Sequence, residues 1–314
     1  MGIEDLRKHL GGKYDDKVLS QIIQSPFIEQ GSPISFEEWR RSFVGAFLCK
    51  TPERIHILRY VAAAIGKETI TWSDFTTTNL TLIRDYVADT VSANSASVYL
   101  NILKALLNEN ADNKQLPHVN FSKALSVRKE PSQNIALTPE EIEKIEKYQP
   151  RNQHEKAVKA QFLCEYYCGA RSSDIQQMSE KNIIDGCIVY VSVKTRIETS
   201  VPLHKNFLKY FRQRGKVYTR ASYNRIIKRI CQNCEINDKV KIFYHGRTQV
   251  VPKYELVSSH TARRSFATTL AQKNVPISTI SKLMNHNGNE TMTSRYICVD
   301  TMNIGNEAMS FFNS

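Results

Sequence analysis

Ser258-Ser259-His260-Thr261-Ala262-Arg263 opens the most informative segment of this chain, which continues through Met284-Asn285-His286 to Tyr296. His260 and Arg263 are three residues apart, so on a helix they lie on the same side. The preceding serines favour a helix start, where free N–H groups and the positive end of the helix dipole attract anions. With His286 and Tyr296 downstream, the segment predicts an anion site with a phenol beside it.

This combination suits phosphoryl transfer through a phosphotyrosine. The charge on the non-bridging oxygens must be stabilised while the tyrosine oxygen attacks. A free tyrosine has a pKa near 10, so Tyr296 needs cationic neighbours or a base at neutral pH. Arg171 and Arg263 can each bind a phosphate through two parallel hydrogen bonds, which a lysine cannot do. His260 would act as acid or base, and His286 would donate to the phosphate.

The segment resembles the catalytic signature of the tyrosine recombinases, the phage-integrase family, which reads H-x-x-R, then (L)-G-H, then Y. Cys168-Gly169-Ala170-Arg171-Ser172-Ser173-Asp174 is similar to the first arginine box of that family, and Lys194-Thr195 to its β-hairpin lysine. The resemblance implies six catalytic residues: Arg171, Lys194, His260, Arg263, His286 and Tyr296. It also implies that Lys194 protonates the departing 5′ oxygen. The departures are Cys168, Ala170 and Met284-Asn285, where the family usually has Thr, Leu and Leu-Gly.

No cofactor is expected. No carboxylate cluster suited to Mg²⁺ accompanies the six residues, and no phosphate-binding P-loop is present. Cys231 and Cys234 have no second pair at zinc spacing, so we predict no metal site. The seven cysteines, an odd number, argue against a disulfide framework and favour a reducing compartment. No membrane-length apolar run occurs, so we expect a soluble intracellular protein. The resemblance implies that it is associated with DNA in the cytoplasm of a bacterial cell.

The charge is concentrated in the second half of the chain. Residues 151–314 contain 25 Lys/Arg and 12 Asp/Glu, although the whole chain has 43 and 31. Between His204 and Arg229 there are nine basic residues, no acidic residue and several aromatics, a pattern typical of a polyanion surface. A solvated helix face is the alternative. The predicted contacts to double-stranded DNA are Lys205, Lys209, Arg212, Arg214, Arg225, Lys228 and Arg229.

The periodicity predicts a mainly α protein with a small antiparallel β-sheet, an α+β fold. We expect an N-terminal arm at 1–31 with a short helix from Asp16 to Ile23, a helical domain at 32–112, a linker at 113–137 and a catalytic domain at 138–314. Ser35 to Glu38 forms a capping box that opens a helix with Trp39, Phe43 and Phe47 inward. Lys194 is predicted at the tip of a hairpin formed by 186–193 and 197–203. The resemblance implies that the helical domain is the core-binding domain that clamps DNA.

We interpret the chain as a site-specific DNA recombinase, an integrase of a mobile element that forms a 3′-phosphotyrosine at Tyr296. A type IB topoisomerase shares these residues and the first step, and a DNA-binding protein with an inactive site is a third possibility. The segment from Thr301 to Ser314 is too apolar to remain in water and too short to form its own core. It packs either on its own domain or, as the resemblance implies, on a neighbouring protomer of a DNA-bound tetramer.

Overall fold

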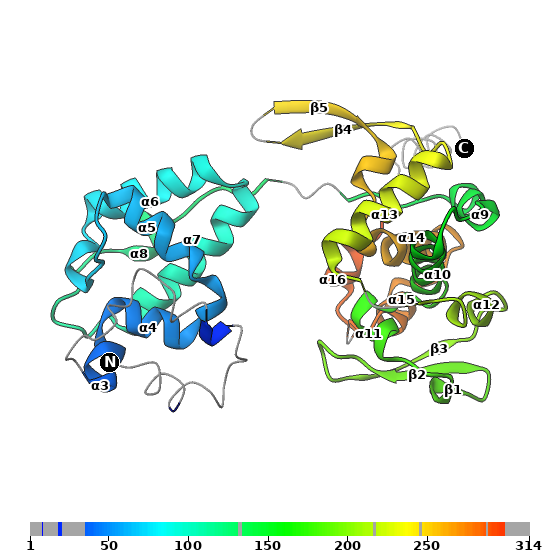
Figure 1. Cartoon of the computed structure of the whole chain (residues 1–314), viewed down its shortest axis with the longest axis horizontal. Helices are drawn as coiled ribbons and strands as arrows, with labels where there is room; N and C mark the ends of the chain where they lie inside the picture. The colour runs from blue at the N-terminus through cyan, green and yellow to red at the C-terminus, as the bar shows by residue number, and fades with distance from the viewer. Residues whose placement is uncertain are drawn as a thin grey trace, which may run out of the picture. The chain divides into compact units, whose positions relative to one another are not determined.

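The computed structural model describes residues 8, 18–20, 35–130, 134–215, 218–244, 247–286 and 288–298. The main division of the chain falls between Pro131 and Ser132 and separates two compact units, each with its own hydrophobic core (Figure 1). Most of the expected 1–31 arm and all of the 301–314 tail lie outside the described residues. Of the expected Asp16–Ile23 helix, residues 18–20 are described, and they are helical with Leu19 buried. The predicted fold class is confirmed, because helices dominate both units and the described strands form only two small antiparallel sheets.

The first unit consists of short helices packed around aromatic side chains. Its elements are α3 (Phe36–Arg41), α4 (Phe43–Lys50), η1 (Pro52–Arg54), α5 (His56–Ile65), η2 (Trp72–Asp74), α6 (Thr77–Thr90), α7 (Ala93–Glu109) and α8 (Phe121–Ala124). The Phe43 ring lies 4.4 Å from Phe75 and 5.3 Å from Trp72, measured between centroids. Tilted and edge-on aromatic pairs of this kind add about 0.5–1.5 kcal/mol beyond the area that they bury.

The single helix predicted after Ser35 is two helices. The Ser35–Glu38 capping box is present, and Trp39, Phe43 and Phe47 are buried as expected. The helix is interrupted at Ser42, where the backbone is extended. The Ser42 hydroxyl accepts a hydrogen bond from the Gly45 nitrogen and so caps the start of α4. Gly45 lies so close to α3 that an added Cβ would come within 1.9 Å of the Trp39 carbonyl oxygen. A straight helix would not allow this contact, so tertiary packing overrides the continuous apolar periodicity.

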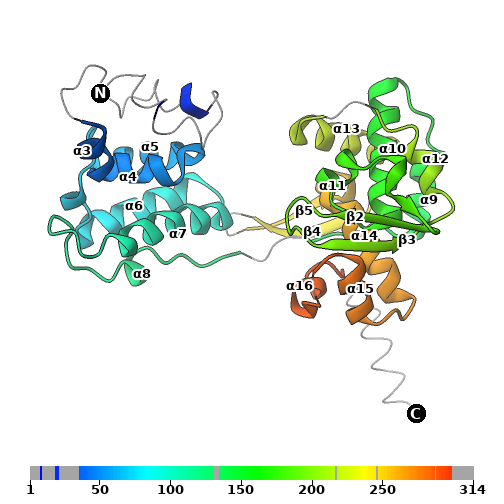
Figure 2. The ribbon, with the colours of Figure 1, turned by 90° about the horizontal axis from the view of Figure 1, so that it is seen from below.

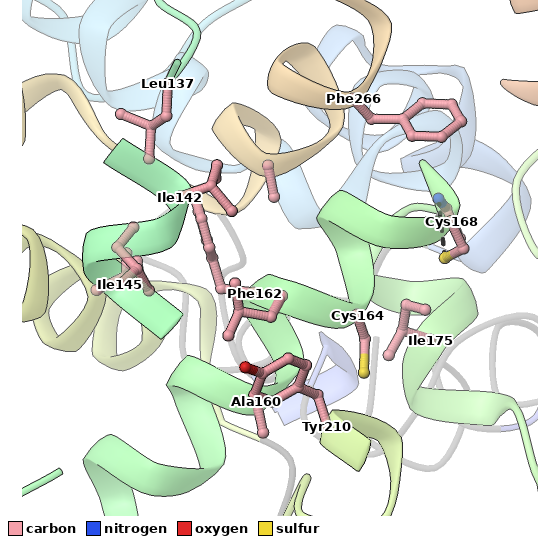
Figure 3. Close-up of a cluster of buried hydrophobic side chains, with 14 of the residues drawn as sticks. Leu137, Ile142, Ile145, Ala160, Phe162, Cys164, Cys168, Ile175, Tyr210 and Phe266 are labelled. Carbon is pink, nitrogen blue, oxygen red and sulfur yellow. Dashed lines mark hydrogen bonds between the residues drawn. The ribbon is translucent and has the colours of Figure 1, made fainter. Parts of the chain in front are cut away.

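The second unit is built around α10 (Gln153–Cys168), which contacts α9, α11, α12, α13 and α14. Its other elements are α9 (Pro139–Lys147), α11 (Ser172–Gln177), η3 (Glu180–Asn182), α12 (Phe207–Phe211), α13 (Arg220–Asn233), η4 (Lys253–Leu256), α14 (Ser259–Gln272), α15 (Ile277–Leu283) and α16 (Glu290–Ser294). Figure 3 shows Phe162 and Cys164 of α10 among the apolar side chains of its neighbours. Burial of each such large side chain contributes about 1.5–3 kcal/mol, which makes α10 the structural axis of the unit.

A three-stranded sheet carries the Lys194 turn. Strands β1 (Ile183–Ile184), β2 (Cys187–Val191) and β3 (Glu198–Pro202) pair antiparallel in that order. Ile188 pairs with Val201 and Tyr190 with Thr199, and these four side chains face the core. The predicted hairpin is therefore correct, although β1 was not expected because it is only two residues long. The turn between β2 and β3 contains Lys194, as predicted from the sequence.

Both units contain further small elements. In the first unit the Asn120 side chain caps the Lys123 nitrogen and starts the short helix α8 at Phe121. Strands β4 (Lys239–Tyr244) and β5 (Arg247–Pro252) form a second hairpin. Helix α15 contacts α14, β3 and α16, as Figure 2 shows from below. Among the described residues, no helix combines the length and apolar character needed to cross a membrane.

Candidate active site

A cavity of about 410 Å³ in the second unit brings together five of the six predicted catalytic residues. Arg171, Lys194, His260, Arg263 and Tyr296 all line it, together with Ala170, Ser172, Ser173, Gln176, Tyr218, Arg220, Tyr223 and Ser259. His286, the sixth, contacts two of these lining residues. A larger cavity of about 730 Å³ lies next to α10 and α12 and contains none of the six. The chemistry of the lining residues makes the smaller cavity the candidate active site.

Arg263 is the most deeply buried charged group of this site, with only 1% of its surface exposed. Its guanidinium donates hydrogen bonds to the carbonyl oxygens of Gly169 and Met284, and Nη2 lies 3.0 Å from Nε2 of His286. No carboxylate binds it directly among the described residues, and its Nε has no hydrogen-bond partner there. Burial, followed by the charge of Arg171, lowers its pKa. A buried cation with no carboxylate partner in the described part of the chain favours a negatively charged ligand.

Gly169 makes this arrangement possible. It ends α10 in the left-handed conformation, with φ of 66°, and an added Cβ would lie 2.4 Å from the Phe266 ring. A residue with a side chain would be strained by the backbone conformation and would collide with that ring. The tight turn presents the Gly169 carbonyl to Arg263 and places Arg171 directly before α11.

Arg171 is held at the edge of the cavity by a small polar network. Its Nη1 donates to the Ser192 hydroxyl at 3.2 Å and lies 3.9 Å from an Asp174 carboxylate oxygen. Asp174 also accepts hydrogen bonds from the Ser192 hydroxyl and from the Val193 nitrogen, the latter at 2.9 Å. Arg171 is therefore oriented by the same groups that anchor the end of β2. No sequence pattern indicated this role for Ser192 or Asp174, although Asp174 belongs to the motif that contains Arg171.

His286 links Arg263 to Tyr296. Because Nε2 accepts from Arg263, Nδ1 carries the proton and donates to the Thr293 hydroxyl at 3.0 Å. The His286 and Tyr296 rings lie 5.0 Å apart between centroids, and Arg263 Cζ is 5.5 Å from the Tyr296 ring. In this arrangement His286 orients the Arg263 guanidinium, and its ring packs against the Tyr296 ring. The phosphate-donor role predicted for His286 would require its Nε2 to carry a proton.

Both site histidines are neutral at pH 7. Burial lowers the pKa of His260 to about 4, with further lowering by four nearby arginines: Arg220, Arg264, Arg263 and Arg171. Burial also lowers the pKa of His286 to about 4, assisted by Arg263 and Arg171. Neutral His260 can accept a proton, as a general base must. Arg220, which lines the cavity, was missed because no sequence motif marks it.

Lys194 differs from the other members of the site. It is exposed in the turn between β2 and β3, and within the described part of the chain it makes no hydrogen bond or ion pair. A long flexible side chain that lines the cavity without a fixed partner remains available to a ligand.

The seven predicted DNA contacts come from α12, α13 and the segment between them, together with Lys205 just before α12. Arg225 and Arg229 of α13 line a third cavity of about 400 Å³, whereas Lys209 of α12 lines the large one. Lys205 and Arg225 are exposed and Lys228 is partly buried. Arg212 pairs with Glu180 at 2.9 Å, and Arg229 pairs with buried Glu155 at 3.1 Å.

Arg214 serves the fold. Its guanidinium donates to the carbonyls of Ile175 and Met178 and stacks 3.7 Å from the Phe211 ring centroid. These bonds satisfy carbonyl groups at the end of α11. Few N–H donors of the Arg214 guanidinium then remain for an external anion. The sequence alone does not distinguish Arg214 from the exposed basic residues near it.

The comparisons identify a class of proteins with this fold and site. Residues 136–302 match the model of the phage integrase family. A lambda integrase (75–356) dimer bound to a COC' core site has 17% identity over 79% of this chain and 88% of that chain, with a TM-score of 0.59. XerH recombinase bound to difH has 14% identity over 99% and 94%, with a TM-score of 0.56. For the Tn1549 transposon integrase (82–397, R225K) in complex with a circular intermediate DNA, identity is 12% over 99% of both chains, with a TM-score of 0.57.

These findings define a tyrosine site-specific recombinase. The chain belongs to the phage integrase family, since the matched region covers more than half of it. No curated protein sequence matches the chain. The membership favours the recombinase over the topoisomerase and the inactive DNA-binding protein. Among the described residues, no group of three or more His, Cys, Asp or Glu side chains is arranged to hold a metal ion.

The lowered pKa of His260 predicts a stability change in acid. Below about pH 6.5 the unfolded chain binds a proton at His260, whereas the folded site resists protonation until about pH 4. The contribution of neutral His260 to the free energy of unfolding should therefore be fully present above pH 6.5. It should be lost as the pH falls towards 4. In His260→Asn the loss of stability between pH 6.5 and pH 4 should be smaller. The urea midpoint of the DNA-free protein, measured across this pH range, tests this. His154→Gln, at an exposed position of α10, is the control, and equal pH dependence in wild type and His260→Asn would contradict the prediction.

Proposed function

We propose that this protein is a site-specific DNA recombinase, an integrase that cleaves and rejoins strands through a covalent bond between Tyr296 and a 3′ phosphate. The observation that carries the proposal is the buried Arg263 guanidinium, which pairs with no carboxylate of the described residues and lies 5.5 Å from the Tyr296 ring. A DNA phosphate in the cavity would give this cation a negatively charged partner. It would also lie beside Arg171, the second arginine of the cavity.

The proposed reaction needs only the side chains of the cavity. The Tyr296 hydroxyl oxygen attacks the phosphorus, and neutral His260 takes the phenolic proton. The bond from phosphorus to the 5′ oxygen breaks, and Lys194 gives its proton to that oxygen, leaving a 5′ hydroxyl and a 3′-phosphotyrosine. Arg171 and Arg263 stabilise the non-bridging oxygens. Loss of one such preorganised donor typically reduces the rate by about 10²–10³.

Rejoining is the same reaction in reverse, with the 5′ hydroxyl of a partner strand as the attacking group. The phosphotyrosine retains the energy of the broken phosphodiester, so no nucleotide cofactor is required. Arg171, Arg263 and Lys194 supply the positive charge that Mg²⁺ supplies in other phosphoryl transfers. We therefore propose that the chemical step needs no metal ion.

Unit 1 and part of the basic surface are proposed to hold the duplex. We assign the clamping role of a core-binding domain to 32–112. On the second unit we propose Lys205, Lys209, Arg225 and Lys228 as the main DNA contacts, and we assign Arg212, Arg214 and Arg229 mainly to intramolecular bonds. Arg225 and Lys228 are tested together, because both belong to α13 and neither has an ion-pair partner within the described residues.

The assembly is proposed to be a tetramer on DNA within a bacterial cell. Solved relatives in this fold include a lambda integrase tetramer bound to a Holliday junction, with 15% identity and a TM-score of 0.59. The apolar segment 301–314, outside the described residues, is proposed to pack on a neighbouring protomer. Such an exchange would couple the position of Tyr296 to the presence of a partner.

The first prediction of the proposed function tests the nucleophile. On a nicked DNA substrate in EDTA, the wild type should accumulate a covalent adduct that survives denaturing electrophoresis, and Tyr296→Phe should bind the DNA but form none. Tyr218 lines the same cavity, so Tyr218→Phe is the matched control and should still form the adduct. Adduct formation by Tyr296→Phe, or a strict requirement of wild type for a divalent ion, would refute the mechanism.

The second prediction tests the DNA surface. Each phosphate contact contributes about 0.9 to the slope of log affinity against log salt. Replacing Arg225 and Lys228 with Gln should therefore flatten the slope by about 2, equally on unrelated sequences. Arg212→Gln, which removes a residue already paired with Glu180, should leave the slope unchanged. An unchanged slope in the double variant would show that this part of α13 is simply solvated.

The third prediction tests the tail. A chain ending at Asp300 should fold and bind a single site, since the site residues and both cores precede this point. It should lose cooperative assembly and recombination. Sedimentation on a two-site DNA, with a recombination assay, measures both. Assembly and recombination as efficient as those of the full chain would show that the tail packs within its own protomer or is dispensable.

A further inference from the structure

The turn that carries Lys194 is fixed from two sides, although the lysine side chain itself is free. On one side the Val193 nitrogen donates to Asp174 of α11 at 2.9 Å. On the other, the Thr195 hydroxyl donates to the side chain of Asn285 at 3.0 Å. Lys194 lies between these two anchored neighbours. Its backbone is therefore held in place, while its ammonium group keeps its mobility.

Asn285 is built into the site. It is only 3% exposed, and both of its polar side-chain atoms are used. Its amide nitrogen donates to the Ile197 carbonyl at 3.0 Å, and its amide oxygen accepts from Thr195. Because a carbonyl can only accept, the bond to Ile197 fixes which end of the amide is the nitrogen. The two bonds span the turn from the residue after Lys194 to the residue before β3.

The location of Asn285 in the chain connects this turn to the phosphate-binding groups. The residue before it, Met284, gives its carbonyl to Arg263, and the residue after it, His286, contacts both Arg263 and Tyr296. Asn285 adopts the left-handed conformation, with φ of 55°, which Asn tolerates better than most residues. A glycine would accept this backbone equally well but could not make either bond to the turn.

We propose that Asn285 is a positioning residue that fixes the Lys194 turn relative to Arg263 and Tyr296, so that the ammonium reaches the departing 5′ oxygen. This inference rests on the proposed function, because it concerns the proton that Lys194 donates in that reaction. The simpler alternative is that Asn285 only satisfies buried polar groups of the turn. The two roles differ in which step of the reaction responds to a substitution.

A DNA substrate with sulfur in place of the scissile 5′ oxygen separates the roles. A thiol has a pKa of about 8.5, so the sulfur can leave as a thiolate without receiving a proton. General acid catalysis contributes about 10²–10⁴ to a rate, and this contribution is lost only on the oxygen substrate. A defect in the placement of Lys194 should therefore disappear on the sulfur substrate, whereas a general distortion of the site should persist.

Asn285→Gly is the main variant, because it preserves the left-handed backbone and removes both bonds. We expect cleavage of ordinary DNA to slow by about tenfold or more, with a near-normal rate on the sulfur substrate. Lys194→Ala should show the same pattern, and adding Asn285→Gly to it should cause little further loss. Thr195→Val, which keeps the side-chain shape and removes one bond, should slow cleavage of the oxygen substrate in the same direction but less.

The outcomes distinguish the two levels of the proposal. If Asn285→Gly slows both substrates equally, or adds its full effect to Lys194→Ala, Asn285 does not act through Lys194, and the inference fails while the recombinase function stands. If the wild type forms no adduct on either substrate, the proposed function fails. Thermal unfolding measures the integrity of each variant. Should Asn285→Gly fail to fold, the sulfur rescue of Thr195→Val alone decides, and its absence overturns the inference.

Discussion

The structure of the site depends on the burial of Arg263. Transfer of an unpaired ion into a protein interior is strongly unfavourable, so the surrounding backbone must compensate for the lost water. Here the compensation comes from the carbonyl groups of Gly169 and Met284 and from the neutral ring of His286. Each of these groups imposes a local conformation. The guanidinium therefore determines the geometry of two separate turns, and these turns carry most of the remaining site.

The charge balance of the site follows from the same burial. Both histidines are neutral at pH 7, since burial and the neighbouring arginines lower the pKa of each to about 4. The permanent positive charge comes from Arg171 and Arg263, supplemented by Lys194. Arginine keeps its proton even when buried, so this charge is present over the whole physiological pH range. The histidines can then exchange protons or orient neighbours without changing the charge offered to an anion.

Sequence patterns predicted the features that depend on short-range chemistry. The capping box at Ser35 and the Lys194 turn both follow from a few adjacent residues. The grouping of the six site residues was obtained from the resemblance to a family, since no spacing rule brings Arg171 next to Tyr296. The break at Ser42 was not predictable, because it results from the close approach of Gly45 to α3.

Two further features lie beyond the reach of sequence patterns because they depend on tertiary contacts. Arg214 looks like any basic residue of its run, yet it bonds to carbonyls about 40 residues away in the chain. Asn285 replaces a glycine that the family usually has, and in sequence this reads as a minor change. Its two bonds to the Lys194 turn bridge separations of about 90 residues. Long-range pairings of this kind become visible only when the chain is folded.

The segment that carries Tyr296 is tied to two distant parts of its own unit. The Asn134 side chain donates a hydrogen bond to the Arg295 carbonyl, 161 residues later. The Cys298 nitrogen donates to the Thr268 hydroxyl of α14, the helix that carries Arg263. Because these two bonds flank Tyr296, a shift of the tyrosine away from the cavity would break contacts both with the arginine helix and with the beginning of the unit.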